Sequence, residues 1–210
     1  MPDIPLARKR RTPEERRAEI MQAAITLFAR QGYARTATKE IAAEAGLSEG
    51  TIFKYFATKQ DILLAFIQTQ AITQLPRVLL AMSDADDELR MREIILERLQ
   101  IWNENHDLMR VIIGEALFNP ELASGLHATL TPFFQILEDY FARRIAEGAF
   151  REVNPRLASR ALIGYCWTYF LLWRTLLFPE MDQADSQPDT VQEILDLFLK
   201  GVLKPGGSEV

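Results

Sequence analysis

The chain has 210 residues, of which 48% are hydrophobic and 25% charged, and this composition is that of a globular protein and excludes an intrinsically disordered one. Its one cysteine, Cys166, excludes an internal disulfide framework, and with His106 and His127 it forms no zinc-binding spacing, so neither a metal nor another cofactor is expected. The net charge is −5, but residues 1–59 hold eleven Lys and Arg against seven Asp and Glu, whereas residues 60–210 hold thirteen against twenty-two, which predicts different partners for the two parts.

The first predicted helix spans residues 13–31. Thr12 is placed to cap it, Pro13 suits the first helical position, and Glu15 completes a capping box. Apolar residues recur on one face of this segment, and Gly32 is placed to end it in a left-handed conformation.

Two short helices and a series of longer ones are predicted after it. No strand hairpin, internal repeat or low-complexity tract is evident, so the fold class is all-α with about nine helices. Prolines at 120, 155 and 179 separate several of the later helices. The predicted ranges are about 38–45, 48–56, 58–80, 88–104, 107–118, 120–147, 156–178 and 189–203.

Residues 161–178 form the most membrane-like stretch. They contain Arg174 and several small or hydroxyl-bearing residues, so a buried helix is favoured over a membrane span. The N-terminus carries basic residues with no apolar segment after them, which does not fit a secretory signal. A cytoplasmic location is therefore expected.

Residues 38–56 combine a short helix, a turn containing Gly46 and a second short helix with polar exposed positions. This is the helix-turn-helix arrangement, in which the second helix enters the major groove of DNA. The absent side chain of Gly50 would let the start of that helix approach the duplex backbone. Taken alone, the pattern also fits an ordinary compact pair of helices.

The segment GYARTATKEIAAEAGLSEGTIFKYFATKQDIL, residues 32–63, resembles the DNA-binding region of the TetR/AcrR family. That family's pattern is a glycine-aromatic pair, threonines, Ile-Ala, Ala-Gly-aliphatic-Ser, a second glycine, an aromatic ending and a lysine. The resemblance covers about residues 12–66 and implies two domains, a helix-turn-helix DNA-binding domain with a basic arm at 1–60 and a larger ligand-binding and dimerisation domain at 61–210.

The resemblance also implies roles for single residues. Thr38 would contact phosphate, Lys39 would reach a base, and Lys59 would open the fourth helix as a phosphate clamp. Phe53 stands where the family often has tyrosine, so packing on a thymine methyl or a sugar is expected there; Glu49, unusual beside a polyanion, would read a cytosine amino group or remain a solvated charge. The recognition helix itself would contribute Ser48, Gly50, Thr51, Phe53, Lys54 and Tyr55, and the basic arm would contribute Arg10 and Arg11 from a cluster that either enters the minor groove or only solubilises the chain.

A homodimer is expected, because two recognition helices must meet two half-sites of a palindromic operator. Small residues at helical spacing on one segment and an apolar stripe on the last helix are the candidates for its interface, with packing inside one chain as the alternative. They are Ala161, Gly164, Thr168 and Thr175, followed by Val191, Ile194, Leu195, Phe198 and Val202.

Members of the family enclose a cavity for a small, largely apolar inducer, and the resemblance implies the same here. The chain is thus expected to be a ligand-responsive regulator, most simply a repressor, that leaves double-stranded DNA when the ligand binds. Two alternatives are an all-helical enzyme, for which no catalytic motif is found, and an interaction module with a non-functional helix-turn-helix. The predicted lining residues are Trp102, Met109, Ile113, Phe134, Leu137, Tyr165, Tyr169 and Trp173.

Overall fold

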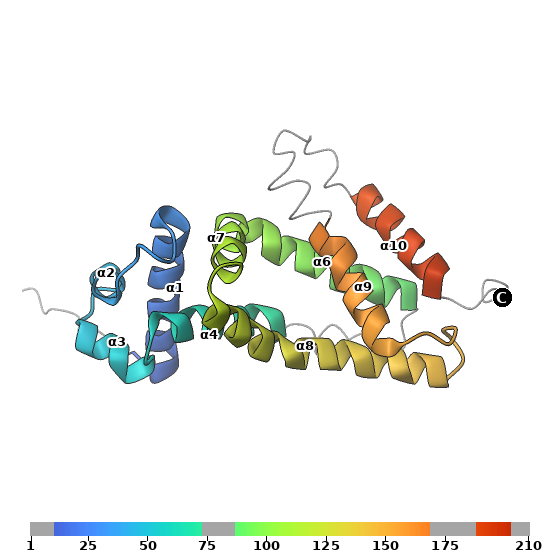
Figure 1. The fold of residues 1–210 in the computed structure, drawn as a ribbon, viewed down its shortest axis with the longest axis horizontal. Helices are drawn as coiled ribbons and strands as arrows, with labels where there is room; N and C mark the ends of the chain where they lie inside the picture. Colours follow the sequence, from blue (N-terminus) through green and yellow to red (C-terminus); the bar gives the residue numbers. More distant parts are fainter. Residues whose placement is uncertain (1–10, 73–86, 169–187, 203–210) are drawn as a thin grey trace, which may run out of the picture. The chain divides into compact units, whose positions relative to one another are not determined.

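The computed structural model describes residues 11–72, 87–168 and 188–202, and every regular element in these ranges is an α-helix (Figure 1). The chain divides into two compact units, residues 1–66 and 67–210, and the division falls inside the fourth helix. The all-α class is confirmed, including nine helices among the described residues. They are α1 (Pro13–Gln31), α2 (Thr38–Glu44), α3 (Glu49–Tyr55), α4 (Lys59–Ile72), α6 (Asp87–Glu104), α7 (His106–Ala116), α8 (Pro120–Ala146), α9 (Pro155–Trp167) and α10 (Pro188–Val202).

The start of α1 is fixed as predicted. The Thr12 hydroxyl accepts a hydrogen bond from the Glu15 N–H at 3.1 Å, and the Glu15 carboxylate accepts one from the Thr12 N–H at 2.8 Å, which completes the capping box. At the other end Gly32 has φ +87°, a region in which a Cβ atom is strained. Its N–H donates the last hydrogen bond of the helix to the Phe28 carbonyl at 2.9 Å, and the helix ends at this glycine.

The first unit has one small core, to which each of its helices contributes. Phe28 of α1 is fully buried, and its ring centroid lies 5.1 Å from that of Tyr33 in the following turn. The helices α2 and α3, with seven residues each, are too short to be stable alone in water, so burial of these side chains against one another holds the unit together. The other buried apolar residues of this unit are Ile20, Ala23, Ala24, Ile25, Leu27, Ile41, Ala42, Ile52, Phe56, Ile62 and Leu63.

The second unit is built around α8, which packs along α9, while α10 lies beside α6 and α9 (Figure 1). Asparagines cap two of these helices. The Asn119 side chain accepts from the Leu122 N–H at 3.1 Å at the start of α8, and the Asn154 side chain accepts from the Arg156 N–H at 3.0 Å at the start of α9. The main core contains Met91, Ile95, Tyr140, Phe141, Phe150, Leu162, Leu195, Phe198, Leu199 and Val202.

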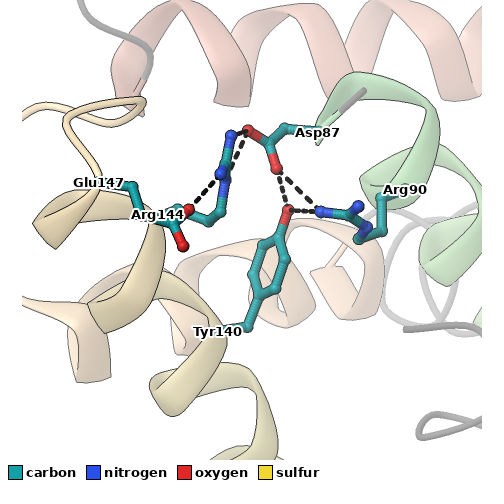
Figure 2. A network of polar contacts seen from close by, with 5 residues as sticks. All are labelled: Asp87, Arg90, Tyr140, Arg144 and Glu147. Carbon is teal, nitrogen blue, oxygen red and sulfur yellow. Dashed lines mark hydrogen bonds and ion pairs between the residues drawn. The ribbon is translucent and has the colours of Figure 1, made fainter. Parts of the chain in front are cut away.

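A buried polar network joins the start of α6 to α8 (Figure 2). Asp87 accepts hydrogen bonds from the Tyr140 hydroxyl, from Arg90 Nη1 at 3.2 Å and from Arg144 Nε and Nη2 at 2.9 and 2.6 Å. Burial and the bond to Asp87 raise the pKa of the Tyr140 hydroxyl, which therefore stays a donor. The hydrogen bond to Asp87 also raises the pKa of Arg144, whose remaining Nη1 pairs with Glu147.

Candidate nucleic-acid interface

The turn between α2 and α3 is held by local hydrogen bonds. Gly46 has φ +65°, and the Leu47 N–H donates to the Ala42 carbonyl at 2.8 Å. Ser48 caps α3, since its hydroxyl accepts from the Thr51 N–H at 3.3 Å and shares a hydrogen bond with the Thr51 hydroxyl at 2.8 Å. The two hydroxyls predicted to face DNA therefore also fix the start of the helix that carries them.

The helix α3 has one buried side and one exposed side. Ile52 is buried in the core of the unit, as is Phe56, which directly follows the helix. Gly50 and Lys54 are exposed, and Phe53 is 51% exposed, which is unusual for so large an apolar side chain. We call the residues Ser48, Gly50, Thr51, Phe53 and Lys54 the recognition edge.

Neither the packing nor the backbone conformation of the chain requires a glycine at position 50. An added Cβ atom would have no heavy atom within 4 Å, and no positive φ is found at this position. The glycine therefore leaves open space on the recognition edge, which a neighbouring molecule can occupy.

The predicted residue Thr38 has a partner that the sequence pattern did not reveal. Its hydroxyl donates to the Glu49 carboxylate at 2.5 Å and so links the first residue of α2 to the first residue of α3. The Glu49 carboxylate is thus engaged within the chain. Lys39, the next residue along α2, is exposed.

Two cations of this unit bond to backbone carbonyls. Arg17 donates to the carbonyl of Tyr55, the last residue of α3, at 3.1 Å. The ammonium of Lys59, at the start of α4, donates to three carbonyls of the turn that precedes α2. The sequence did not predict the contact of Arg17, and for Lys59 it predicted a DNA phosphate as the partner.

The basic arm lies mostly outside the described residues, and this includes Arg10. Arg11 is described; it is exposed and forms an ion pair with Glu19 of α1. A surface pair of this kind is worth little, so it does not prevent Arg11 from contacting another anion.

The predicted ligand-lining residues are spread over the second unit. Trp102 packs against the main core, and Leu137 is buried in a second cluster with Phe133, against which Phe134 packs. Met109 and Ile113 are partly buried on α7, and Tyr165 is 48% exposed with its ring 6.3 Å from that of Phe198. Tyr169 and Trp173 lie outside the described residues.

The residues predicted for the dimer interface separate into three groups. The side chains of Leu195, Phe198 and Val202 are buried in the chain's own main core, against which Ala161 also packs. Gly164 is partly buried and Thr168 is exposed, both near the end of α9. Thr175 lies outside the described residues, as do the side chains of Val191 and Ile194.

The membrane-like stretch 161–178 is described only as far as residue 168, in α9 and the residue after it. Within the ranges that the structure covers, no helix is both long enough and apolar enough to cross a bilayer.

Two family models match the chain. The model for bacterial regulatory proteins of the tetR family matches residues 20–66, which contain α2 and α3, and the model for the C-terminal domain of AefR-like transcriptional repressors matches residues 95–201, about half of the chain. The nucleoid occlusion factor SlmA of Haemophilus influenzae is 29% identical over 170 residues, which are 78% of this chain and 77% of SlmA.

Solved structures agree in fold. A putative TetR-family regulator from Mesorhizobium loti superposes with a TM-score of 0.76 at 21% identity, covering 92% of this chain and all of that one. FadR of Bacillus subtilis, solved in complex with stearoyl-CoA, gives 0.70 at 23% identity over 85% of this chain and 96% of FadR. With a helix-turn-helix unit and a helical second unit that both match, the chain belongs to the TetR family of DNA-binding transcription regulators, which decides against the enzyme alternative.

Proposed function

We propose that this protein is a ligand-responsive transcriptional repressor that binds a palindromic operator as a homodimer. The observation that carries the proposal is the recognition edge, which presents two hydroxyls, one cation and the ring of Phe53, while the opposite side of α3 is buried in the unit's own core. Gly50 leaves this edge open to close approach. An edge of this kind fits the major groove of a duplex.

Each residue of the edge has a chemical task in this proposal. The hydroxyls of Ser48 and Thr51 donate to phosphates or bases, and Lys54 supplies charge toward base edges. The half-exposed ring of Phe53 packs on a thymine methyl or a sugar, since no polar atom is available on it. Tyr55, the last residue of α3, and Lys39, which is exposed on α2, are proposed to add further contacts to DNA.

The dimer contact is proposed on the exposed faces of α9 and α10. Leu197 is 67% exposed, and Tyr165 and Trp167 are exposed apolar side chains near the end of α9. The helices α9 and α10 pack against each other, and exposed apolar residues on packed helices are typical of association surfaces. Gly164 and Thr168 keep that part of α9 open to close approach.

Leu197→Glu should therefore weaken self-association of the full chain by at least about tenfold, because it places a charge in a surface that is buried on pairing. Leu117→Glu is the matched control, since Leu117 is similarly exposed but follows α7 instead. Sedimentation equilibrium measures both. Equal dissociation of the two variants and the parent chain would contradict this placement of the interface.

The inducer is proposed to be small and largely apolar, and to bind within residues 67–210. Two observations support this. The apolar side chains of Trp102, Phe134 and Leu137 lie at the two core clusters. FadR was solved with stearoyl-CoA, a ligand that has a long apolar chain. The ligand would have to bind the DNA-incompetent arrangement more tightly, because equal affinity for both arrangements shifts nothing. The helix α4, which continues from one compact unit into the other, would transmit the change.

The test is selection of bound duplexes from random DNA by the purified full chain. We expect a palindromic consensus, two chains per duplex, and affinity that falls steeply with salt. Loss of DNA binding on addition of an apolar compound would support the ligand response. Increased transcription from the selected site in cells that lack the protein would support the role as a repressor. Recovery of no consensus, with weak binding to every duplex, would instead favour an interaction module with a non-functional helix-turn-helix.

A further inference from the structure

We propose that Arg17 and Lys59 are positioning residues that hold the recognition helix in place from inside the first unit, and that neither makes a DNA phosphate contact. This inference rests on the proposed DNA binding and replaces the phosphate clamp expected at Lys59. Both residues would count as cations available to DNA if the sequence alone were considered.

The ammonium of Lys59 is used within the chain. Its Nζ donates to the Tyr33 carbonyl at 2.8 Å, to the Thr36 carbonyl at 3.1 Å and to the Ala34 carbonyl at 3.3 Å. An ammonium has three donors, and three carbonyls meet them here. The Nζ also lies 4.4 Å from the centroid of the Tyr33 ring, whose face attracts a cation.

The turn that Lys59 holds leads directly into α2. Thr36 closes it, because its hydroxyl donates to the Gly32 carbonyl at 2.8 Å and its N–H donates to the Tyr33 carbonyl at 3.2 Å. Charge-assisted bonds from Lys59 join this turn to the first residue of α4. The orientation of α2 is therefore fixed relative to α4.

The recognition helix is tethered at both ends to this frame. At its start, Glu49 accepts the hydrogen bond of Thr38, the first residue of α2. At its end, the Tyr55 carbonyl accepts from Arg17 of α1, whose guanidinium carbon lies 4.2 Å from the centroid of the Phe56 ring. A cation at the C-terminal end of a helix also interacts favourably with the helix dipole.

These contacts form a connected path from α4 through the turn and α2 to α3, and from α3 to α1. A displacement of α4 would loosen the three carbonyl bonds of Lys59 and so release α2 and α3 from their fixed orientation. The two cations thus act on affinity through geometry, whereas a phosphate contact acts through charge neutralisation.

The salt dependence of binding separates these two effects. A phosphate contact adds about 0.9 to the slope of log affinity against log salt concentration, or about 1.8 for the two chains of a dimer. We would measure fluorescence anisotropy of a labelled selected duplex with the full-length chain between 50 and 300 mM KCl, that is at roughly physiological ionic strength and on both sides of it. The variants are Lys59→Met and Arg17→Met, with Lys54→Met as the same chemical change on the exposed edge.

We expect Lys59→Met and Arg17→Met each to lower affinity at least about tenfold without a change of slope. Lys59→Arg should also bind weakly, because a planar guanidinium does not reproduce the three-carbonyl geometry, although arginine binds phosphate as well as lysine does. Hydrogen exchange of the amides in residues 33–38 should accelerate in Lys59→Met and Lys59→Arg but not in Lys54→Met.

A slope lowered by about 1.8 in Lys59→Met, together with full affinity in Lys59→Arg, would overturn the inference for Lys59. Where a methionine variant does not fold by circular dichroism, Lys59→Arg and Arg17→Lys carry the test, since both keep the charge. If the parent chain itself selects no duplex, the proposed function fails. The positioning role of Lys59 is tested independently by hydrogen exchange, and unchanged exchange of residues 33–38 in Lys59→Arg would contradict it.

Discussion

Replacing Asp87 by asparagine tests the buried network of the second unit. The substitution keeps the shape of the side chain and removes a carboxylate that faces both Arg90 and Arg144 (Figure 2). Removing one member of a buried ion pair costs about 3–5 kcal/mol. We expect about 3 kcal/mol, the lower end, because the Arg144 side chain is 27% exposed and keeps its pairing with Glu147.

Urea unfolding followed by the circular dichroism of the helices measures this cost. With a slope of about 2 kcal/mol per molar urea, the midpoint of the second unit should fall by about 1.5 M. Glu147→Gln is the matched control: it breaks the exposed ion pair of the same arginine and should cost less than about 1 kcal/mol. Tyr140→Phe should cost about 2 kcal/mol, and the double variant with Asp87→Asn should cost less than the sum, because the first removes and the second weakens the same hydrogen bond. Equal midpoints for Asp87→Asn and Glu147→Gln would refute the reasoning.

Two further predictions concern DNA. Lys54→Met should reduce discrimination among bases more than overall affinity, because Lys54 lies on the exposed edge of the recognition helix. Competition between the selected duplex and its single-base variants measures this discrimination. Unchanged discrimination would show that Lys54 does not read a base. Deletion of residues 1–11, which include Arg8, Lys9, Arg10 and Arg11, should weaken DNA binding. It should also lower the slope of log affinity against log salt concentration by about 0.9 for each phosphate that the arm neutralises. If the deleted and full chains bind with equal affinity at several salt concentrations, the arm has no role in binding.

Local signals made the helices of the first unit predictable. The capping box at Thr12, the proline after it and Gly32 act over a few residues, so they can be seen without knowledge of the fold. The sides of α3 were predictable for the same reason, since helical spacing places Ile52 and Phe56 together, away from Gly50 and Lys54.

Contacts between distant parts of the chain were not predictable in this way. Arg17 and Tyr55 are 38 residues apart, and Lys59 reaches carbonyls 23–26 residues before it, so no local pattern indicates that these cations are used internally. The apolar stripe of α10 correctly identified a buried face. Its partner could not be identified from periodicity, and the structure shows Leu195, Phe198 and Val202 in the core of their own chain.

Gly50→Ala tests most directly whether the recognition edge faces DNA. The added methyl group meets no heavy atom of the chain within 4 Å, and alanine favours a helix over glycine, so the free energy of unfolding of the first unit should stay the same or rise by about 0.5 kcal/mol. Affinity for the selected duplex should fall at least about tenfold, because the methyl group occupies the space into which the duplex backbone fits. Unchanged affinity in a chain of equal or greater stability would contradict the placement of α3 in the groove.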